Sequence, residues 1–203
     1  MTVRWRTLLA GALLVLATGC AGPAADPDLS AALLQPADLP AGYGPIPPEP
    51  SDGAVSSTDP DCAATLDGIE VDPPADPTVQ EVRALFGDAT FGRIQHVVRA
   101  YPAGQAAAEV ERVRAVLAGC STFENTYADS STVTLTVTPR TAPAVGEAAW
   151  AGEIRAETDA FALVNQLVLV QAGDRTAALS VLTPDGPDIA TVDDLAERAA
   201  ARL

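Results

Sequence analysis

The sequence predicts an α+β domain: an antiparallel β-sheet of about five to six strands, two main helices packed on one face, and a disulfide-stapled N-terminal segment. Segments between residues 79 and 182 alternate apolar and polar residues, as strands do, whereas 104–118 and 192–203 repeat apolar residues at helical spacing. Most of the strand-like segments follow one another through short turns, which favours hairpins over parallel crossovers. Hydrophobic residues make up 48% of the 203 residues, enough for one packed core plus a processing segment.

The chain opens with the three parts of an export signal. Arg4 and Arg6 form a basic start, residues 8–17 form an apolar run, and small residues precede Cys20. The apolar run is too short to span a bilayer, which needs about 20 residues. The stretch LLVLATGC resembles the lipobox of bacterial lipoproteins, with alanine at the position where leucine is usual. We therefore expect a lipoprotein signal peptide over 1–19 and lipidation at Cys20; an ordinary secretory signal is the alternative.

Lipidation would place the protein on the extracytoplasmic face of the cell membrane. A diacylglyceryl group supplies two acyl chains, and each buried methylene contributes about 0.8 kcal/mol, whereas a single chain holds a protein only marginally. Residues 20–28, rich in small residues, proline and aspartate, are then a lipidated tether. Residues 29–203 remain as one domain.

The charge of the chain argues against nucleic acid as a partner. The formal net charge is −15, and loss of Arg4 and Arg6 with the signal peptide takes it to about −17. Such a surface repels nucleic acid and anionic lipid head groups, so the expected membrane contact is the anchor. A surface that is acidic for solubility alone explains the charge equally well.

The two remaining cysteines are expected to form a disulfide. An exported domain with Cys62 and Cys120 left over most simply pairs them. The competing interpretation is a catalytic thiol, which needs a histidine partner, and His96 is the one histidine in the sequence.

Little regular structure is expected before residue 77. Residues 29–34 suit a short helix before a proline, and 44–61 are dense in proline, glycine, serine and aspartate. One helical turn is predicted over 62–66, followed by a loop over 67–77.

Six strands and two helices are predicted beyond this region. The strands are expected at 82–86, 91–101, 131–139, 147–157, 161–171 and 176–182. Leu167 to Val170 are apolar on both faces, which predicts a central strand covered on both sides, and Gly173-Asp174 suits a tight hairpin turn. The helix over 104–118 has an apolar stripe, and the helix over 192–203 begins with a capping-box pattern at Thr191.

These features together resemble a group of actinobacterial lipoproteins similar to the PknH-like extracellular sensor domains of mycobacterial kinases. The resemblance rests on the lipobox, LLQPADLPAGY, a loop cysteine, an alanine-rich helix ending in LAGC, LVLVQAGDRTAALSVL and LAERAAARL, and it covers residues 29–203. Its motifs are architectural rather than catalytic. It implies an exported antiparallel domain with a disulfide-linked helix and a cleft for an unidentified ligand, and it supplies no binding residues. The kinase sensor domains have a second disulfide, for which this chain has no cysteines.

No catalytic residues, metal site or cofactor are predicted. The sequence lacks HExxH, GxSxG, GxGxxG, Walker and CxxC motifs. His96 lies in an apolar strand without a second histidine, the acidic residues between 59 and 76 lack EF-hand spacing, and Glu153 with Glu157 is only a generic carboxylate pair. Tyr101 and Trp150, with His96, are the candidates for lining a cleft, although ordinary core positions explain all three.

The sequence therefore predicts a lipid-anchored, non-enzymatic envelope domain that binds a small-molecule, lipid or protein partner through a cleft beside the sheet. The alternative is a carrier of envelope lipids, which needs a large apolar cavity. A hydrolase is the least favoured class, because no catalytic constellation is present.

Overall fold

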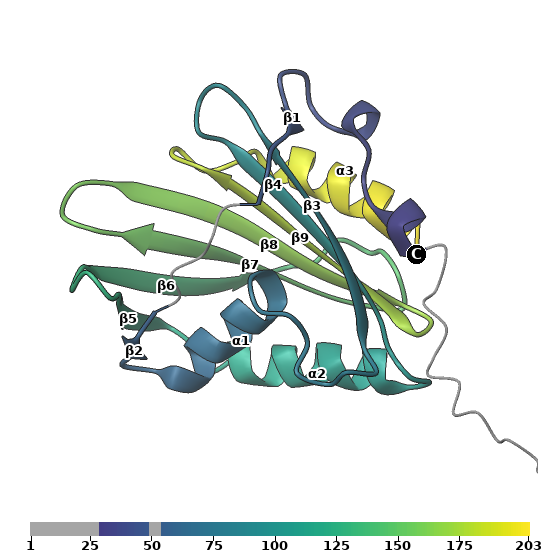
Figure 1. Ribbon diagram of the computed structural model, residues 1–203, viewed down its shortest axis with the longest axis horizontal. Coiled ribbons are helices and arrows are strands. Elements are labelled where there is room, and N and C mark those ends of the chain that lie inside the picture. The colour runs from purple at the N-terminus through teal and green to yellow at the C-terminus, as the bar shows by residue number, and fades with distance from the viewer. Residues whose placement is uncertain (1–28, 49–53) are drawn as a thin grey trace, which may run out of the picture.

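The computed structural model describes residues 29–48 and 54–203, and within them the chain forms one nine-stranded antiparallel sheet (Figure 1). The strand order is β1-β3-β4-β9-β8-β7-β6-β5-β2. The strands are β1 (Gly44–Pro45), β2 (Ser56–Ser57), β3 (Gln80–Gly87), β4 (Arg93–Ala100), β5 (Thr122–Thr126), β6 (Thr132–Arg140), β7 (Ala148–Glu157), β8 (Ala162–Ala172) and β9 (Arg175–Thr183). Consecutive strands from β5 to β9 pair as hairpins, so their register depends on short turns.

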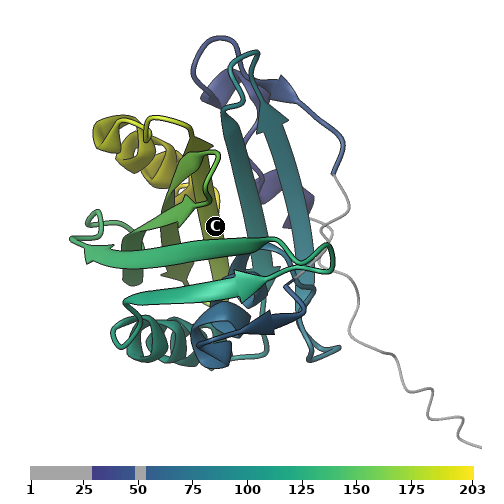
Figure 2. The same ribbon diagram turned by 90° about the vertical axis from the view of Figure 1, so that its left-hand side faces the viewer.

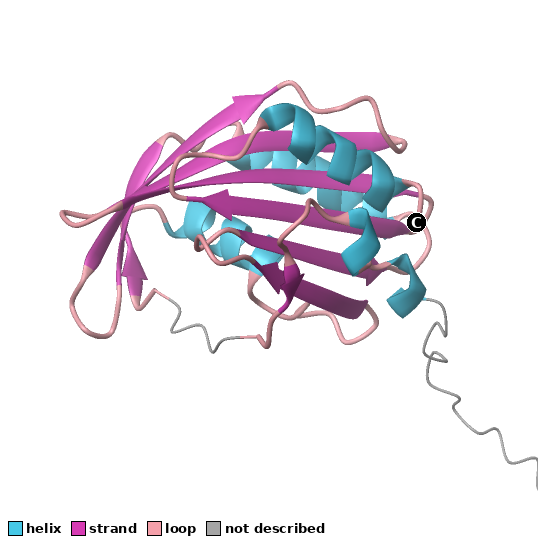
Figure 3. Ribbon diagram, turned by 90° about the horizontal axis from the view of Figure 1, so that it is seen from above, coloured by secondary structure: helices cyan, strands magenta, loops and turns pink. Residues whose placement is uncertain are grey.

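Helices cover both faces of this sheet. The α-helices are α1 (Pro60–Glu70), α2 (Gln105–Leu117) and α3 (Ile189–Ala200), and two 3₁₀ turns, η1 (Leu29–Ala32) and η2 (Pro36–Asp38), precede them. Helices α1 and α2 lie together on one face, while α3 lies on the other (Figures 1 and 2). Figure 3 shows α3 lying along the strands, with η1 and η2 beside it near the end of the chain.

Strand β8 explains why helices pack on both faces of the sheet. Val168 and Val170 point to the α3 face and pack in a core cluster with Leu195, whereas Leu167 and Leu169 point to the α1/α2 face. These four side chains are all buried, as the sequence predicts for a central strand. The protein therefore has two cores, one on each side of the sheet.

The predicted fold class is wrong in three respects, the first being the number of strands. All six predicted strands are present, but β1, β2 and β5 are additional. Two-residue strands such as β1 and β2 are too short to show a period, and β5 has only Phe123 and Asn125 as buried alternating positions. The second error is the placement of both main helices on one face, since α2 and α3 lie on opposite faces.

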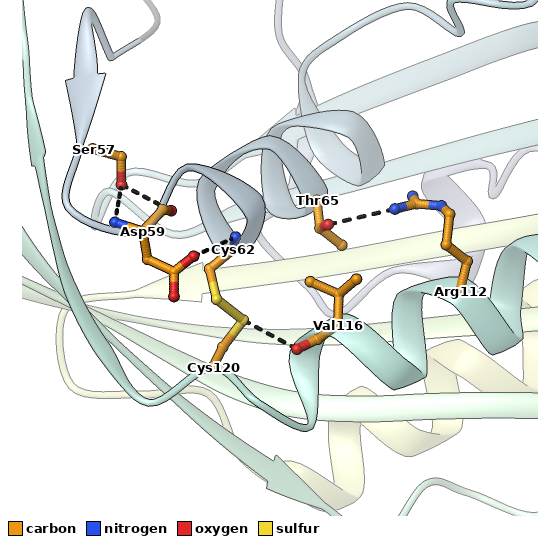
Figure 4. The surroundings of a disulfide bond; sticks show 7 residues. All are labelled: Ser57, Asp59, Cys62, Thr65, Arg112, Val116 and Cys120. Atoms are coloured by element: carbon orange, nitrogen blue, oxygen red, sulfur yellow. Dashed lines mark hydrogen bonds between the residues drawn. A yellow bond between two sulfur atoms is a disulfide. The ribbon is translucent and has the colours of Figure 1, made fainter.

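The third error concerns what the disulfide holds. Cys62 and Cys120 are bonded, but Cys62 is the third residue of α1 and Cys120 follows α2, so the bond joins two helices rather than an N-terminal segment (Figure 4). Helix α1 is also longer than the predicted single turn. The side chain of Asp59 accepts a hydrogen bond of 3.0 Å from the Cys62 N–H and caps the helix, and Pro60 occupies its first position.

Residues 29–45 precede α1 and are called the strap, and their first part packs on the α3 face of the sheet. Leu29, Ala32 and Leu34 are buried there. Asp38 of the strap pairs with Arg202 near the C-terminus at 2.7 Å. Gly44 and Pro45 form β1 against the end of β3, so the strap passes from the α3 face to the sheet edge.

Candidate binding clefts at the end of helix α1

The structure does not bring the three predicted cleft residues together. His96 on β4 is 0% exposed and faces the α3 side, whereas Tyr101 and Trp150 belong to the α1/α2 side. Trp150 is 5% exposed and packs over Gly152, where an added Cβ would lie 2.6 Å from its ring. Tyr101 lines a cleft, while His96 and Trp150 are core residues.

His96 connects the strap to the sheet. Its Nδ1 accepts a hydrogen bond of 3.0 Å from the Leu34 N–H, so the ring proton lies on Nε2, which has no partner among the described residues. Burial lowers the pKa of His96 to about 4, with Arg202 acting in the same direction and Asp38 against it. The ring is therefore neutral at ordinary pH.

Tyr101 lines the larger of two clefts beside α1, called the Tyr101 cleft. Its volume is about 550 Å³, and it lies between the loop after α1 and the first turns of α2. It is lined by Ala64, Gly68, Asp72, Pro73, Pro74, Ala75, Asp76, Val79, Arg99, Tyr101, Gln105, Ala108, Glu109 and Arg112. Burial raises the pKa of Tyr101, so its hydroxyl stays protonated. Arg112 pairs with Glu109 at 2.8 Å, so the walls carry internally paired charge.

Side chains from the sheet cap the C-terminal end of α1. Helix ends leave carbonyls without partners, and α1 has no basic residue in its last turn. Arg99 of β4 donates to the carbonyls of Gly68 at 2.6 Å and Asp72 at 2.9 Å. It forms a salt bridge with Glu81 at 2.7 Å.

A neighbouring arginine and a glutamine complete this cap. Arg83 of β3 donates to the Val71 carbonyl at 2.9 Å and also pairs with Glu81. The Gln95 side chain donates to the carbonyl of Glu70. The end of α1 is thereby fixed against β3 and β4, and the position of the Glu70 carboxyl follows from it.

The second cleft opens beside the end of α1 and is called the Glu70 cleft. Its volume is about 330 Å³, at the lower end of the range for small-molecule sites. It is lined by Pro45, Ile46, Pro48, Glu70, Val71, Arg83, Ala84, Leu85, Phe86 and Gln95. Most of the lining is apolar, and the polar groups gather at the end of α1.

The Glu70 carboxyl is held by uncharged donors. Asn165 of β8 donates to Oε1 at 2.8 Å, and Ser180 of β9 fixes the Asn165 amide through a hydrogen bond of 2.9 Å to its oxygen. Burial raises the pKa of Glu70 and Asp67 adds to the rise, whereas hydrogen bonding with Ser180 and Asn165 opposes it. None of the salt bridges among the described residues includes Glu70.

Sequence reasoning missed this carboxyl because it counted Glu70 with the acidic residues of a loop. Those acidic residues do not gather: among the described residues, no three His, Cys, Asp or Glu side chains are placed to share a metal ion. The missed signal was the length of α1, because a helix extending to residue 70 carries this side chain onto the sheet.

The architecture is thus that of an antiparallel sheet with helices on both faces and two clefts at the end of a disulfide-linked helix. The fold is similar to the crystal structure of the extracellular domain of PknH from Mycobacterium tuberculosis, with a TM-score of 0.69 and 16% sequence identity. The match covers 89% of this chain and 96% of that domain. The PknH-like fold predicted from the sequence is therefore confirmed. No protein-family model and no curated protein matches the sequence.

The membrane predictions fall on a different part of the chain. Cys20, the signal peptide and the tether lie outside the described residues. Across 29–48 and 54–203, no helix combines the length and apolar character needed to cross a bilayer.

Proposed function

We propose that this chain is a lipid-anchored, non-enzymatic binding domain of sensor type on the extracytoplasmic face of the cell membrane, and that it takes a small ligand in the Glu70 cleft. One observation carries the proposal: a mostly apolar cleft has its polar lining residues, Glu70, Arg83 and Gln95, gathered at the end of α1. Ligand sites combine apolar walls with a few fixed polar groups in this way.

The fold adds support, since the similar structure is the extracellular domain of another protein. The arrangement of polar groups also favours binding over catalysis. Ser180 is hydrogen-bonded to Asn165, and His96 lies on the opposite face of the sheet, so a serine–histidine pair is not formed. Glu153 accepts a hydrogen bond from Gln166 on the α3 side, away from both clefts.

Carriage of envelope lipids receives less support. It needs a large enclosed apolar cavity, whereas the Tyr101 cleft is charged and the Glu70 cleft measures only about 330 Å³. Binding of a protein partner to the surface of the domain is compatible with a small ligand in the cleft.

Native mass spectrometry of protein extracted from membranes tests the binding function. We expect an additional small mass on the wild type that disappears from Leu85→Trp, which fills the Glu70 cleft, but persists on Ala108→Trp, which narrows the Tyr101 cleft. A mass retained by Leu85→Trp and lost from Ala108→Trp would move the site to the Tyr101 cleft. A wild-type protein without any bound mass would contradict a small-ligand function.

The anchor is tested by Cys20→Ala. Two acyl chains hold a protein on a membrane, so the variant should leave the membrane fraction. A variant that still sediments with membranes after a salt wash would show that Cys20 is not the attachment point.

A further inference from the structure

We propose that the Glu70 cleft binds a small amphipathic anion, whose carboxylate contacts Arg83 at the edge of the sheet while an apolar body lies along the cleft wall. This inference rests on the proposed function and names the chemical class of its ligand.

The first argument is a positive charge that the protein only partly neutralises. Arg83 and Arg99 both form salt bridges with Glu81, and no other carboxylate among the described residues pairs with either arginine. Two guanidinium groups therefore share one carboxylate. The Arg99 side chain is only 9% exposed and also donates to two backbone carbonyls, so the unshared charge lies mainly at Arg83.

The second argument is that Arg83 keeps hydrogen-bond donors for a ligand. A guanidinium carries more N–H groups than the three that Arg83 uses, which bond to Glu81 and to the Val71 carbonyl. The Arg83 side chain is 34% exposed, and Val71 lines the same cleft, so the guanidinium lies at the cleft wall. Its remaining N–H groups can donate charge-assisted hydrogen bonds to a carboxylate.

The backbone of Arg83 adds a donor at the same place. Backbone groups of successive strand residues face opposite sides, and the Leu85 carbonyl accepts from the Ile46 N–H at the outer edge of β3. The backbone N–H of Arg83, two positions away, therefore also faces this edge. Pro47 and Pro48, which have no N–H, end the pairing, and no described residue accepts from the Arg83 N–H. The cleft opens along this edge, because Ile46 and Pro48 line it together with β3.

The nearby carboxyl groups do not cancel the preference for an anion. The Glu70 carboxyl is buried against Asn165, and burial raises its pKa and favours the neutral acid. Asp67 and Asp72 do not line this cleft, and Asp72 lines the Tyr101 cleft instead. The carbonyls at the end of α1, where the helix dipole is negative, are capped by side chains of β3 and β4.

The walls and the charge set the size and valence of the ligand. Ile46, Leu85 and Phe86 line the cleft, and its volume of about 330 Å³ suits one ring or a short alkyl chain. Among the described residues a single guanidinium lines the cleft, and Glu81 takes part of its charge. A singly charged carboxylate is therefore favoured over a doubly charged phosphate, since the second charge would lack a partner.

The test compares carboxylates with uncharged amides of the same shape. Isothermal titration calorimetry at neutral pH measures binding of hexanoate and phenylacetate, and of hexanamide and phenylacetamide, to the full-length lipidated protein in a nonionic detergent. Charge-assisted hydrogen bonds exceed neutral ones, so we expect each carboxylate to bind about 10- to 100-fold more tightly than its amide. In Arg83→Gln this preference should fall to within about threefold. Arg155→Gln is the matched control and should retain it, since Arg155 is also a strand arginine paired with glutamates.

Two further measurements do not depend on how well Arg83→Gln folds. Raising the NaCl concentration from about 50 to 500 mM should weaken carboxylate binding to the wild type about threefold or more and leave the amides unchanged, because salt screens a partly exposed ion pair. Leu85→Trp keeps Arg83 and removes space for the apolar body, so it should weaken binding of the carboxylates and the amides alike.

Equal affinity of carboxylate and amide for the wild type would overturn the inference. So would a preference that survives in Arg83→Gln, carboxylate binding that salt leaves unchanged, or an absence of carboxylate binding. Those results would leave the proposed function standing if membrane-extracted protein still carried a small mass that Leu85→Trp loses. A wild type without a bound mass would contradict the function itself.

Discussion

Acid should destabilise this protein through His96. The ring is buried under the strap, its Nδ1 accepts from the Leu34 N–H, and its Nε2–H has no partner among the described residues. A second proton would fall on Nδ1, where it would face the Leu34 N–H and replace an acceptor with a donor. Protonation therefore works against docking of the strap, with Arg202 nearby adding repulsion and Asp38 attraction.

The size and sign of the effect follow from the two pKa values. The pKa of His96 is lowered from 6.5 to about 4, so between these pH values the unfolded chain binds more protons than the folded one. Stability is then complete above pH 6.5 and falls as the pH is lowered toward 4. Since a tenfold change in protonation is worth about 1.4 kcal/mol, the loss should approach about 3 kcal/mol.

The assay is urea unfolding at several pH values between 7 and 4, for the wild type and for His96→Asn. The asparagine places an oxygen near the position of Nδ1 and cannot titrate. Because the sequence has one histidine, the difference between the two stability curves isolates its contribution, and titration of Glu70 and other carboxyls cancels. Two parallel curves across this range would refute the reasoning, whatever the absolute cost of the substitution.

Two further changes should affect stability in opposite directions. Replacing both Cys62 and Cys120 with alanine opens a link across a sequence separation of 58 residues, which should cost about 4 kcal/mol in urea unfolding; a loss below about 1 kcal/mol would contradict this. Phe91 is 82% exposed with φ at 65°, so Phe91→Gly should raise stability by about 1 kcal/mol, measured as a higher thermal midpoint. Phe161→Gly is the control, since Phe161 is also exposed but lacks the positive φ, and an equal gain there would exclude backbone strain as the cause.

The regular parts of the fold were predictable because they are long enough to show a period. Strands β6 to β9 and helix α2 alternate or repeat over nine or more residues, and Gly173 at the β8–β9 turn has the positive φ that the Gly-Asp pair predicts. Strand β8 is apolar on both faces, and this pattern predicts helices on both faces of the sheet. It conflicts with the prediction that both main helices pack on one face. The face on which each helix packs depends on contacts between residues far apart in the sequence. The apolar pattern of β8 therefore predicted the helix positions better than the patterns of the helices themselves.

The candidate site was less predictable, because its groups meet only through the fold. Glu70, Gln95, Asn165 and Ser180 come from a helix and three strands, and none of them belongs to a local motif. Aromatic residues were a poor guide, since Trp150 fills the core beside Gly152. Glycine at 152 leaves room for that ring, which packs over the position two residues along the same strand.

The position of the two ends of the domain sets practical limits on how it can be labelled. The strap begins beside the C-terminus, where Arg202 pairs with Asp38, and the turns that precede β4 and β8 lie at the opposite end of the sheet (Figure 1). A fluorescent protein fused after Leu203 would thus crowd the strap and, in an anchored molecule, the bilayer. The turn over 127–131, between β5 and β6, lies away from the C-terminus, so a reporter inserted there should leave the strap free.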